Sequence, residues 1–292
     1  MGNLQDLVQF IFAGLTGGAI YALVALGFGV VHNTMGIVNF TQVDFVSLGG
    51  MILFSALFAA GLPMAPALVA AVAGVTLAAM AVEELGLRPS RSQSHLVLIF
   101  LTIGLSIILR GIMKIIWGKN RMAVPPLTSE EPVHLLGATI LPQTLWILAL
   151  TAVAIVLLVL FFRKTAMGLA MRGVAANPEA AAVVGLKVWR VKAVSFALAG
   201  ALGGLAGCLV TPITTLSYDV GVLLGLKGFA AAILGGFGSF PGAILGGLIL
   251  GLLESLGAAY LSSAYKDVIA FVVLLLVLFV RPRGLLGGKG SG

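Results

Sequence analysis

The sequence predicts an all-α fold: a polytopic transmembrane helical bundle of about eight to nine spans, formed by residues 1–292 as a single domain. Apolar residues make up 60% of the 292 residues and charged residues only 9%, whereas about a quarter of the residues in a soluble domain are charged. The mean hydropathy is +1.15. Because each span uses roughly 20 apolar residues, the chain has no room for a soluble catalytic domain.

Hydropathy over windows of about 19 residues locates the candidate spans. The segment before the first span lacks the basic start of a cleavable signal peptide, so we expect that span to be retained. In chain order the spans are expected near 8–32, 36–61, 64–82, 96–117, 143–162, 193–214, 222–240, 241–260 and 264–280.

Two of these segments, near 36–50 and 225–247, are predicted to be broken or re-entrant helices. The first carries polar side chains where a lipid-facing helix would be apolar, namely Asn39, Thr41, Gln42 and Asp44. The second is rich in glycine, including Gly235, Gly236 and Gly238. Irregular backbone at membrane depth is tolerated only where protein surrounds it or where it lines a watery cavity. Both segments are therefore candidates for lining a translocation pathway.

Charged side chains inside the predicted spans leave alternatives open. Asp44 would cost several kcal/mol against lipid, so it either lines the pathway or braces a broken helix. The same two interpretations apply to its polar neighbours. Glu254 is expected to snorkel or to pair, while Lys227, and Arg110 together with Lys114, are expected to snorkel to the interface.

Basic residues gather in three segments between or after the spans. Loop 163–192 holds six basic residues against one acid. The others are Arg88 and Arg91 in loop 83–95, and Arg281, Arg283 and Lys289 in the tail. By the positive-inside rule all three segments should be cytoplasmic. Three spans precede loop 83–95, which puts the N-terminus outside unless one of the segments is re-entrant.

Loop 163–192 contains residues typical of the start and the end of a short helix. Asn177 is a good N-cap, Pro178 suits the first helical position, and Glu179 favours the positive end of the helix dipole. Gly185 is a typical stop. The small side chains between them, Ala180, Ala181 and Ala182, would let another surface approach closely. This helix is either a docking element for a cytoplasmic partner or an amphipathic connector on the membrane surface.

Four motifs in the same order resemble a known family. They are Asn39-Phe40, the stretch Arg172-Gly-Val-Ala-Ala-Asn-Pro-Glu-Ala-Ala181, the glycine-rich run 227–247 and the tail Arg281-Pro-Arg-Gly-Leu-Leu-Gly287. Together they resemble the permeases of branched-chain amino acid ABC importers, the leucine, isoleucine and valine type. The family often has glycine and glutamate where this chain has Val43 and Asp44, which leaves open whether the segment breaks at Val43 as in relatives.

The resemblance implies a role and a set of partners. It implies an ATPase-coupling site formed by Asn177, Pro178, Glu179, Ala180, Ala181 and Gly185. It also implies import by alternating access, with a second related permease subunit, identical or different, two cytoplasmic ATPase subunits and an extracytoplasmic substrate-binding protein. The location would be the bacterial plasma (inner) membrane, in contact with lipid, with loop 163–192 and the C-terminus cytoplasmic.

Other classes of function have less support. An ion-coupled secondary transporter of a small solute would need ionisable residues in its spans, and only Asp44 and Glu254 are well placed. No phosphate-binding loop of the Gly-x-x-x-x-Gly-Lys-Ser/Thr type occurs. We expect no enzyme activity, no cofactor, no metal site and no nucleic-acid partner.

Overall fold

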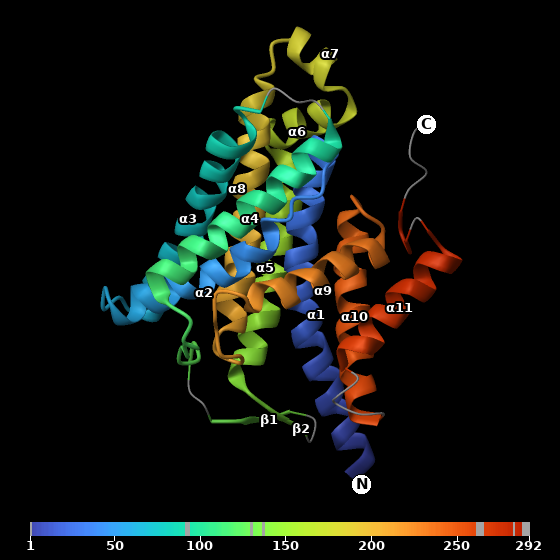
Figure 1. The fold of residues 1–292 in the computed structure, drawn as a ribbon. Helices are drawn as coiled ribbons and strands as arrows, with labels where there is room; N and C mark the ends of the chain where they lie inside the picture. The colour runs from blue at the N-terminus through green and yellow to red at the C-terminus, as the bar shows by residue number, and fades with distance from the viewer. Residues whose placement is uncertain are drawn as a thin grey trace.

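The computed structural model describes residues 2–90, 94–128, 131–135, 138–260, 266–282 and 284–287. These residues form an elongated bundle of helices with one small hairpin (Figure 1). The elements are α1 (Gly2–Met35), α2 (Gln42–Phe58), α3 (Met64–Ala81), the π-helix η1 (Val82–Leu87), α4 (His95–Trp117), β1 (Val133–Leu135), β2 (Ala138–Ile140), α5 (Pro142–Lys164), α6 (Ala166–Ala176), α7 (Pro178–Val183), α8 (Val188–Val210), α9 (Val220–Gly235), α10 (Phe240–Tyr260) and α11 (Lys266–Val280).

The prediction of an all-α polytopic bundle is confirmed. Within the described residues, six helices are long and apolar enough to cross a membrane: α1, α3 continued by η1, α4, α5, α8 and α10. The apolar helices α2 and α9 are shorter, and α11 contributes a further short apolar segment. Of the basic residues used to predict the cytoplasmic side, Arg91, Arg283 and Lys289 lie outside the described residues.

The two predicted broken segments are irregular over only a few residues each. The first break covers 36–41, where Gly36 has a φ of +68°, and α2 then runs without interruption through Val43. The second break covers 236–239, where Gly236 and Gly238 have φ values of +104° and +90°. Only glycine adopts this left-handed region readily. The chain therefore does not break at Val43, because the turn is completed before it.

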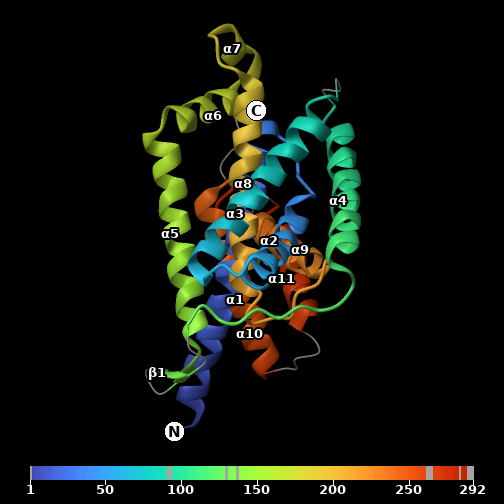
Figure 2. The same ribbon diagram turned by 90° about the vertical axis from the view of Figure 1, so that its left-hand side faces the viewer.

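The inner helices α1, α2, α8, α9 and α10 pack backbone to backbone. A methyl group on Gly207 of α8 would lie 1.9 Å from the carbonyl oxygen of Val46 in α2, and one on Gly251 of α10 would lie 2.3 Å from the amide of Gly18 in α1. Small residues allow this close approach of helices. Figure 2 shows α5 and α4 on opposite sides of this inner group.

The two ends of the bundle differ. Helices α6 and α7 cap one end, while the start of α1 and the antiparallel hairpin β1–β2, with Val133 opposite Ile140, lie at the other (Figures 1 and 2). Helix α3 ends as η1 at the α7 end (Figure 1). The connection between α5 and α8 is thus folded into helices that project beyond the bundle.

Candidate functional site

Helix α7 begins as its sequence predicts. Asn177 has extended backbone, and its side-chain oxygen accepts a hydrogen bond from the amide of Ala180 at 2.9 Å. Pro178 occupies the first helical position, where the missing amide costs nothing. Glu179 lies in the first turn, beside the positive end of the helix dipole. These local contacts stabilise a six-residue helix that would otherwise be too short to persist.

The end of α7 is a Schellman motif. Gly185 has a φ of +89°, its amide donates to the carbonyl of Ala182 at 3.0 Å, and the amide of Leu186 donates to the carbonyl of Ala181 at 3.0 Å. A residue other than glycine would be strained at position 185. Both ends of α7 are therefore fastened by the residues that the sequence singles out.

Apart from Glu179, the exposed side chains of α7 and its C-cap are small and apolar. Val183 is 88% exposed and Val184 76% exposed, and Glu179, Ala180 and Ala182 are exposed as well. Ala181 is only 5% exposed, so it packs against its own chain and cannot meet a partner. A projecting apolar surface of this kind is typical of a site for another protein.

The polar residues at the first break bond to one another and to the backbone, although Nδ2 of Asn39 and Oε1 of Gln42 have no hydrogen-bond partner among the described residues. The side-chain oxygen of Asn39 accepts hydrogen bonds from the amide of Thr41 at 3.1 Å and from its hydroxyl at 2.6 Å. The amide nitrogen of the Gln42 side chain donates to the carbonyl of Ala199 in α8 at 3.1 Å. A methyl group on Gly27 would come within 2.1 Å of that nitrogen. The absence of a side chain at Gly27 of α1 therefore makes room for the Gln42 side chain between the inner helices.

Asp44 pairs with the outer helix α4. Its Oδ1 lies 3.1 Å from Nε of Arg110, and the hydroxyl of Ser106 donates to its other oxygen. Arg110 also donates to the Ser106 hydroxyl at 3.0 Å. Arg110, 32% exposed in its side chain, is therefore drawn toward Asp44, and the expectation that it snorkels with Lys114 is wrong. Lys114 lies instead over the ring of Tyr218 at 5.9 Å.

All four polar side chains of this segment are buried inside the chain. The residues Asn39, Thr41, Gln42 and Asp44 are each 0% exposed. They touch α4 and α8 through the contacts just described. Their geometry therefore agrees with a brace for the helix break, one of the two interpretations drawn from the sequence.

The glycines at the second break are packed by backbone. A methyl group on Gly235 would lie 1.9 Å from the carbonyl oxygen of Gly242 in α10. The side chain of Asn33 in α1 donates to the carbonyl of Gly238 at 2.8 Å, and the amide of Leu286 donates to the carbonyl of Gly235 at 2.9 Å. Gly235, Gly236 and Gly238 therefore hold the α9–α10 joint against α1 and the segment after α11.

Sequence reasoning missed a buried ion pair between the inner helices. Nζ of Lys227 in α9 lies 2.6 Å from Oε1 of Glu254 in α10, with side-chain exposures of 5% and 2%. The hydroxyl of Tyr21 in α1 donates to Oε2 of Glu254 at 2.7 Å. The expectation that Lys227 snorkels is wrong. Of the two expectations for Glu254, snorkelling or pairing, the structure shows pairing with Lys227. Two opposite charges in glycine-rich apolar segments are the signal that could have revealed the pair.

Glu254 and Tyr21 also line a cavity of about 360 Å³ between α1 and α10. Its remaining lining residues are Phe10, Ala13, Gly17, Gly251, Ser255, Ala258 and Ala259. Its lining residues in α1 run from Phe10 to Tyr21, mostly in the half of that helix nearer its N-terminus. The cavity brings one carboxylate, held by Lys227, next to an apolar wall.

The residues that could bind a metal are scattered. Within the described ranges, no group of three His, Cys, Asp or Glu side chains is close enough to share an ion. Cys208 is buried, with its sulfur 3.4 Å from the carbonyl of Gly49, and His32 packs edge-on against Phe237. These side chains serve packing between inner helices.

Comparison with known proteins decides the family. Residues 10–278 match the model of the permease component of branched-chain amino acid transport systems. The chain belongs to this family. It is 35% identical to the high-affinity branched-chain amino acid transport system permease protein LivH of Escherichia coli (strain K12), over 96% of this chain and 95% of LivH. It is 32% identical to the corresponding protein BraD of Pseudomonas aeruginosa, over 98% of each chain.

A solved structure shares the fold of this permease. The complex of PsaBC from Streptococcus pneumoniae with a Fab aligns with a TM-score of 0.50 and 15% sequence identity, over 94% of this chain and 92% of that chain. The family resemblance inferred from the sequence motifs is confirmed, and the chain is a multi-pass membrane protein. In this permease, the residues Asn177 to Ala181 of the loop motif cap and begin the projecting helix α7.

Proposed function

We propose that this chain is the membrane-spanning permease subunit of an ABC importer that moves branched-chain, aliphatic amino acids inward by alternating access, driven by a separate ATPase. The observation that carries the proposal is the identity with LivH along almost the whole chain. The projecting, doubly capped helix α7 supports it, because an energy-supplying subunit needs a rigid element to push against.

The proposed arrangement places partners at both ends of the bundle. Two ATPase subunits dock on the α7 end of this permease and of a second, related permease, and a substrate-binding protein docks at the end where α1 begins. The chain sits in the bacterial plasma (inner) membrane with loop 163–192 and the C-terminus in the cytoplasm and the N-terminus outside. The six basic residues of that loop support this orientation.

The two helix breaks border the translocation pathway in this proposal. Irregular backbone at membrane depth is costly unless it serves a cavity or a joint. Asn39, Thr41, Gln42 and Asp44 brace the joint between α1 and α2, and Gly235, Gly236 and Gly238 form the joint between α9 and α10. The full burial of the four polar side chains and the backbone contact of Gly235 with Gly242 support a bracing role, with the substrate passing beside the joints rather than touching these residues.

The docking role of α7 is tested by Val183→Arg in the reconstituted transporter. Val183 is 88% exposed, so the substitution leaves the fold intact but places a charge on the apolar docking surface. We expect the complex to insert and to bind its substrate-binding protein, while substrate-stimulated ATP hydrolysis and leucine uptake fall about tenfold or more, the effect of about 1.4 kcal/mol at an interface.

The matched control is Val183→Ala. It shortens the same exposed side chain, 88% exposed, but keeps the surface apolar and adds no charge. It should retain most of the stimulated ATP hydrolysis. Normal hydrolysis and uptake in Val183→Arg would show that α7 is a connector and would remove the structural support for the proposal.

The alternative, an ion-coupled secondary transporter, has less support. Both of its candidate carboxylates, Asp44 and Glu254, are paired with a basic side chain. Leucine uptake should vanish when ATP is depleted while ion gradients are clamped. Uptake that instead follows the clamped proton or sodium gradient would favour the alternative.

A further inference from the structure

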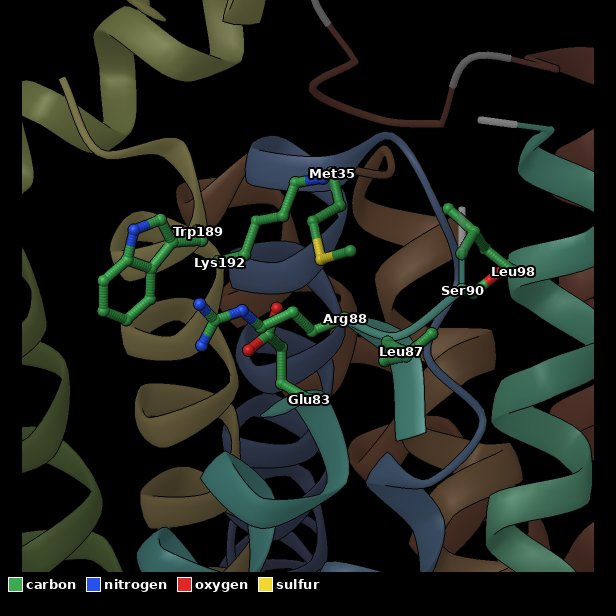
Figure 3. A pocket seen from close by; sticks show the side chains of 8 residues that line it. All are labelled: Met35, Glu83, Leu87, Arg88, Ser90, Leu98, Trp189 and Lys192. Atoms are coloured by element: carbon green, nitrogen blue, oxygen red, sulfur yellow. The ribbon is translucent and has the colours of Figure 1, made fainter. Parts of the chain in front are cut away.

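A second cavity lies at the α7 end of the bundle, apart from the residues of the two helix breaks. It has a volume of about 220 Å³ and is bounded by η1, α4, α8 and the end of α1. Figure 3 shows its side chains gathered around one space. They are Met35, Glu83, Leu87, Arg88, Ser90, Leu98, Trp189 and Lys192.

Glu83 brings a buried carboxylate to this cavity. The residue is 1% exposed, and its Oε2 has no hydrogen-bond partner among the described residues. No described Lys or Arg nitrogen lies within the 4.0 Å of an ion pair with it. A buried charge without a partner is costly. Glu83 also sits in the π-helix η1, a rare element that is frequently found at functional sites.

Two cations line the same space at a greater separation. The guanidinium of Arg88 is held over the ring of Trp189 at 4.3 Å from its centroid, which fixes its direction. Lys192 follows Trp189 by nearly one turn of α8. Leu87, Met35 and Leu98 complete the wall with apolar surface. The cavity therefore combines one carboxylate, two cations and an apolar surface.

This combination selects the chemistry of a ligand. A simple anion would meet the Glu83 carboxylate, and a simple cation would be repelled by Arg88 and Lys192. A zwitterion avoids both costs, since its ammonium can pair with Glu83 and its carboxylate with the two cations. The volume is below the roughly 300–1,000 Å³ of sites for drug-sized molecules, so the ligand is small. The apolar wall suits an aliphatic side chain.

We propose that this cavity is a cytoplasmic binding site for a free aliphatic α-amino acid, the product of transport, through which the internal pool restrains import. The identity and the side of the ligand rest on the proposed function. A ligand held between Glu83 and Lys192 ties the end of α3 to the start of α8. Helix α8 follows α7 after only a few residues. A ligand that links α3 to α8 therefore also restricts the movement of α7, the helix on which the ATPase docks in the proposed function.

Equilibrium binding to the purified transporter, with its ATPase subunits but without ATP or binding protein, tests the ligand class. The probes are radiolabelled leucine, with 4-methylpentanoate, 3-methylbutylamine and inorganic phosphate as competitors. Each charged hydrogen-bonded contact contributes about 1.5–3 kcal/mol. 4-Methylpentanoate lacks the ammonium of leucine and 3-methylbutylamine lacks its carboxylate, so each should compete at least about tenfold more weakly than unlabelled leucine. Phosphate or 4-methylpentanoate competing as well as leucine would show an anion site and overturn the proposal.

Variants locate the binding and its effect. Glu83→Gln should weaken leucine binding about tenfold, keep uptake into empty proteoliposomes, and abolish the inhibition caused by leucine preloaded on the ATPase side. Glu84→Gln, which removes an adjacent but exposed carboxylate, is the matched control and should change neither. Lys192→Met provides a second test that does not alter η1 and should also weaken binding.

The failures of the two proposals are distinguishable. A transporter that takes up no leucine with its binding protein present contradicts the proposed function. A transporter that takes up leucine but binds it equally well in the wild type, Glu83→Gln and Lys192→Met contradicts only the site in this cavity.

Discussion

The inner and outer helices of this permease use glycine in opposite ways. On the inner helices, a methyl group added to Gly207 would collide with a backbone carbonyl at 1.9 Å. On the outer helix α4, methyl groups added to Gly104 or Gly111 would meet nothing within 4 Å. On the inner helices glycine therefore allows close helix contact, whereas on α4 these two glycines face open space. Composition alone does not separate these two meanings, since both regions are apolar and contain glycine.

The ion pairs follow the same division. Lys227 and Glu254 join two inner helices and are both almost fully buried. Asp44, on the inner helix α2, reaches outward to Arg110 on α4, whose side chain is 32% exposed. A pair with one partially hydrated member costs less to break than a pair enclosed on all sides. The substitutions below test this ranking, from the largest expected effect to the smallest.

The largest effect is expected from Gly207→Leu. The new side chain cannot fit without moving the backbone of α2, so we expect a loss of stability beyond the roughly 1–3 kcal/mol of ordinary overpacking. The measurement is the thermal unfolding of the detergent-solubilised protein, with the yield of monodisperse protein. An unchanged unfolding temperature would show that α2 and α8 are not in contact at this point.

Lys227→Met should have the next largest effect. It leaves the Glu254 carboxylate buried without its cation, and breaking a buried pair in this way costs about 3–5 kcal/mol. The double variant Lys227→Met with Glu254→Gln removes both charges and should recover most of that loss. Unfolding in detergent measures both. A single variant as stable as the wild type would mean that Glu254 is hydrated through the adjacent cavity.

Asp44→Asn should have a moderate effect. It removes the charge but keeps the shape, and Arg110 can turn toward water, so we expect a loss of about 1–3 kcal/mol. Leucine uptake, measured per folded molecule, should be unchanged if Asp44 is a brace. Full stability combined with abolished uptake would assign Asp44 to the pathway instead.

The smallest effect, of opposite sign, is expected from Gly111→Ala. Alanine is favoured over glycine within a helix by about 0.5–1 kcal/mol, and nothing in the structure opposes its methyl group. The unfolding temperature should rise slightly, in contrast to Gly207→Leu. If Gly111→Ala leaves the isolated permease stable but prevents assembly of the transporter, the exposed surface of α4 is an interface with a second permease.

Several parts of the structure could be predicted from neighbouring residues. The spans follow from runs of apolar side chains, and α7 follows from Asn177, Pro178 and Gly185, whose capping contacts lie within a few residues of each other. The helix breaks were predicted in the right regions, the first from its polar side chains and the second from its glycines, and in the structure Gly36, Gly236 and Gly238 have the positive φ that other residues avoid. The exact extent of the breaks was not predicted. Helix α2 includes Val43, which is buried by neighbouring helices, and those contacts cannot be read from the local sequence.

The sequence by itself therefore determined the membrane bundle, its family and the short helix α7, because hydropathy, capping and glycine conformation act over one or two turns of chain. Only the tertiary structure decided which charges meet. Lys227 pairs with Glu254 on the next helix, 27 residues along the chain, and Asp44 pairs with Arg110 and with Ser106, which is 62 residues away. Glu83 and Arg88 at η1 likewise share a cavity with Lys192 of α8, which only the packing of η1 with α1, α4 and α8 creates. Burial removes water as the alternative partner, so packing decides whether a charged side chain snorkels, pairs with another side chain or stays without a partner.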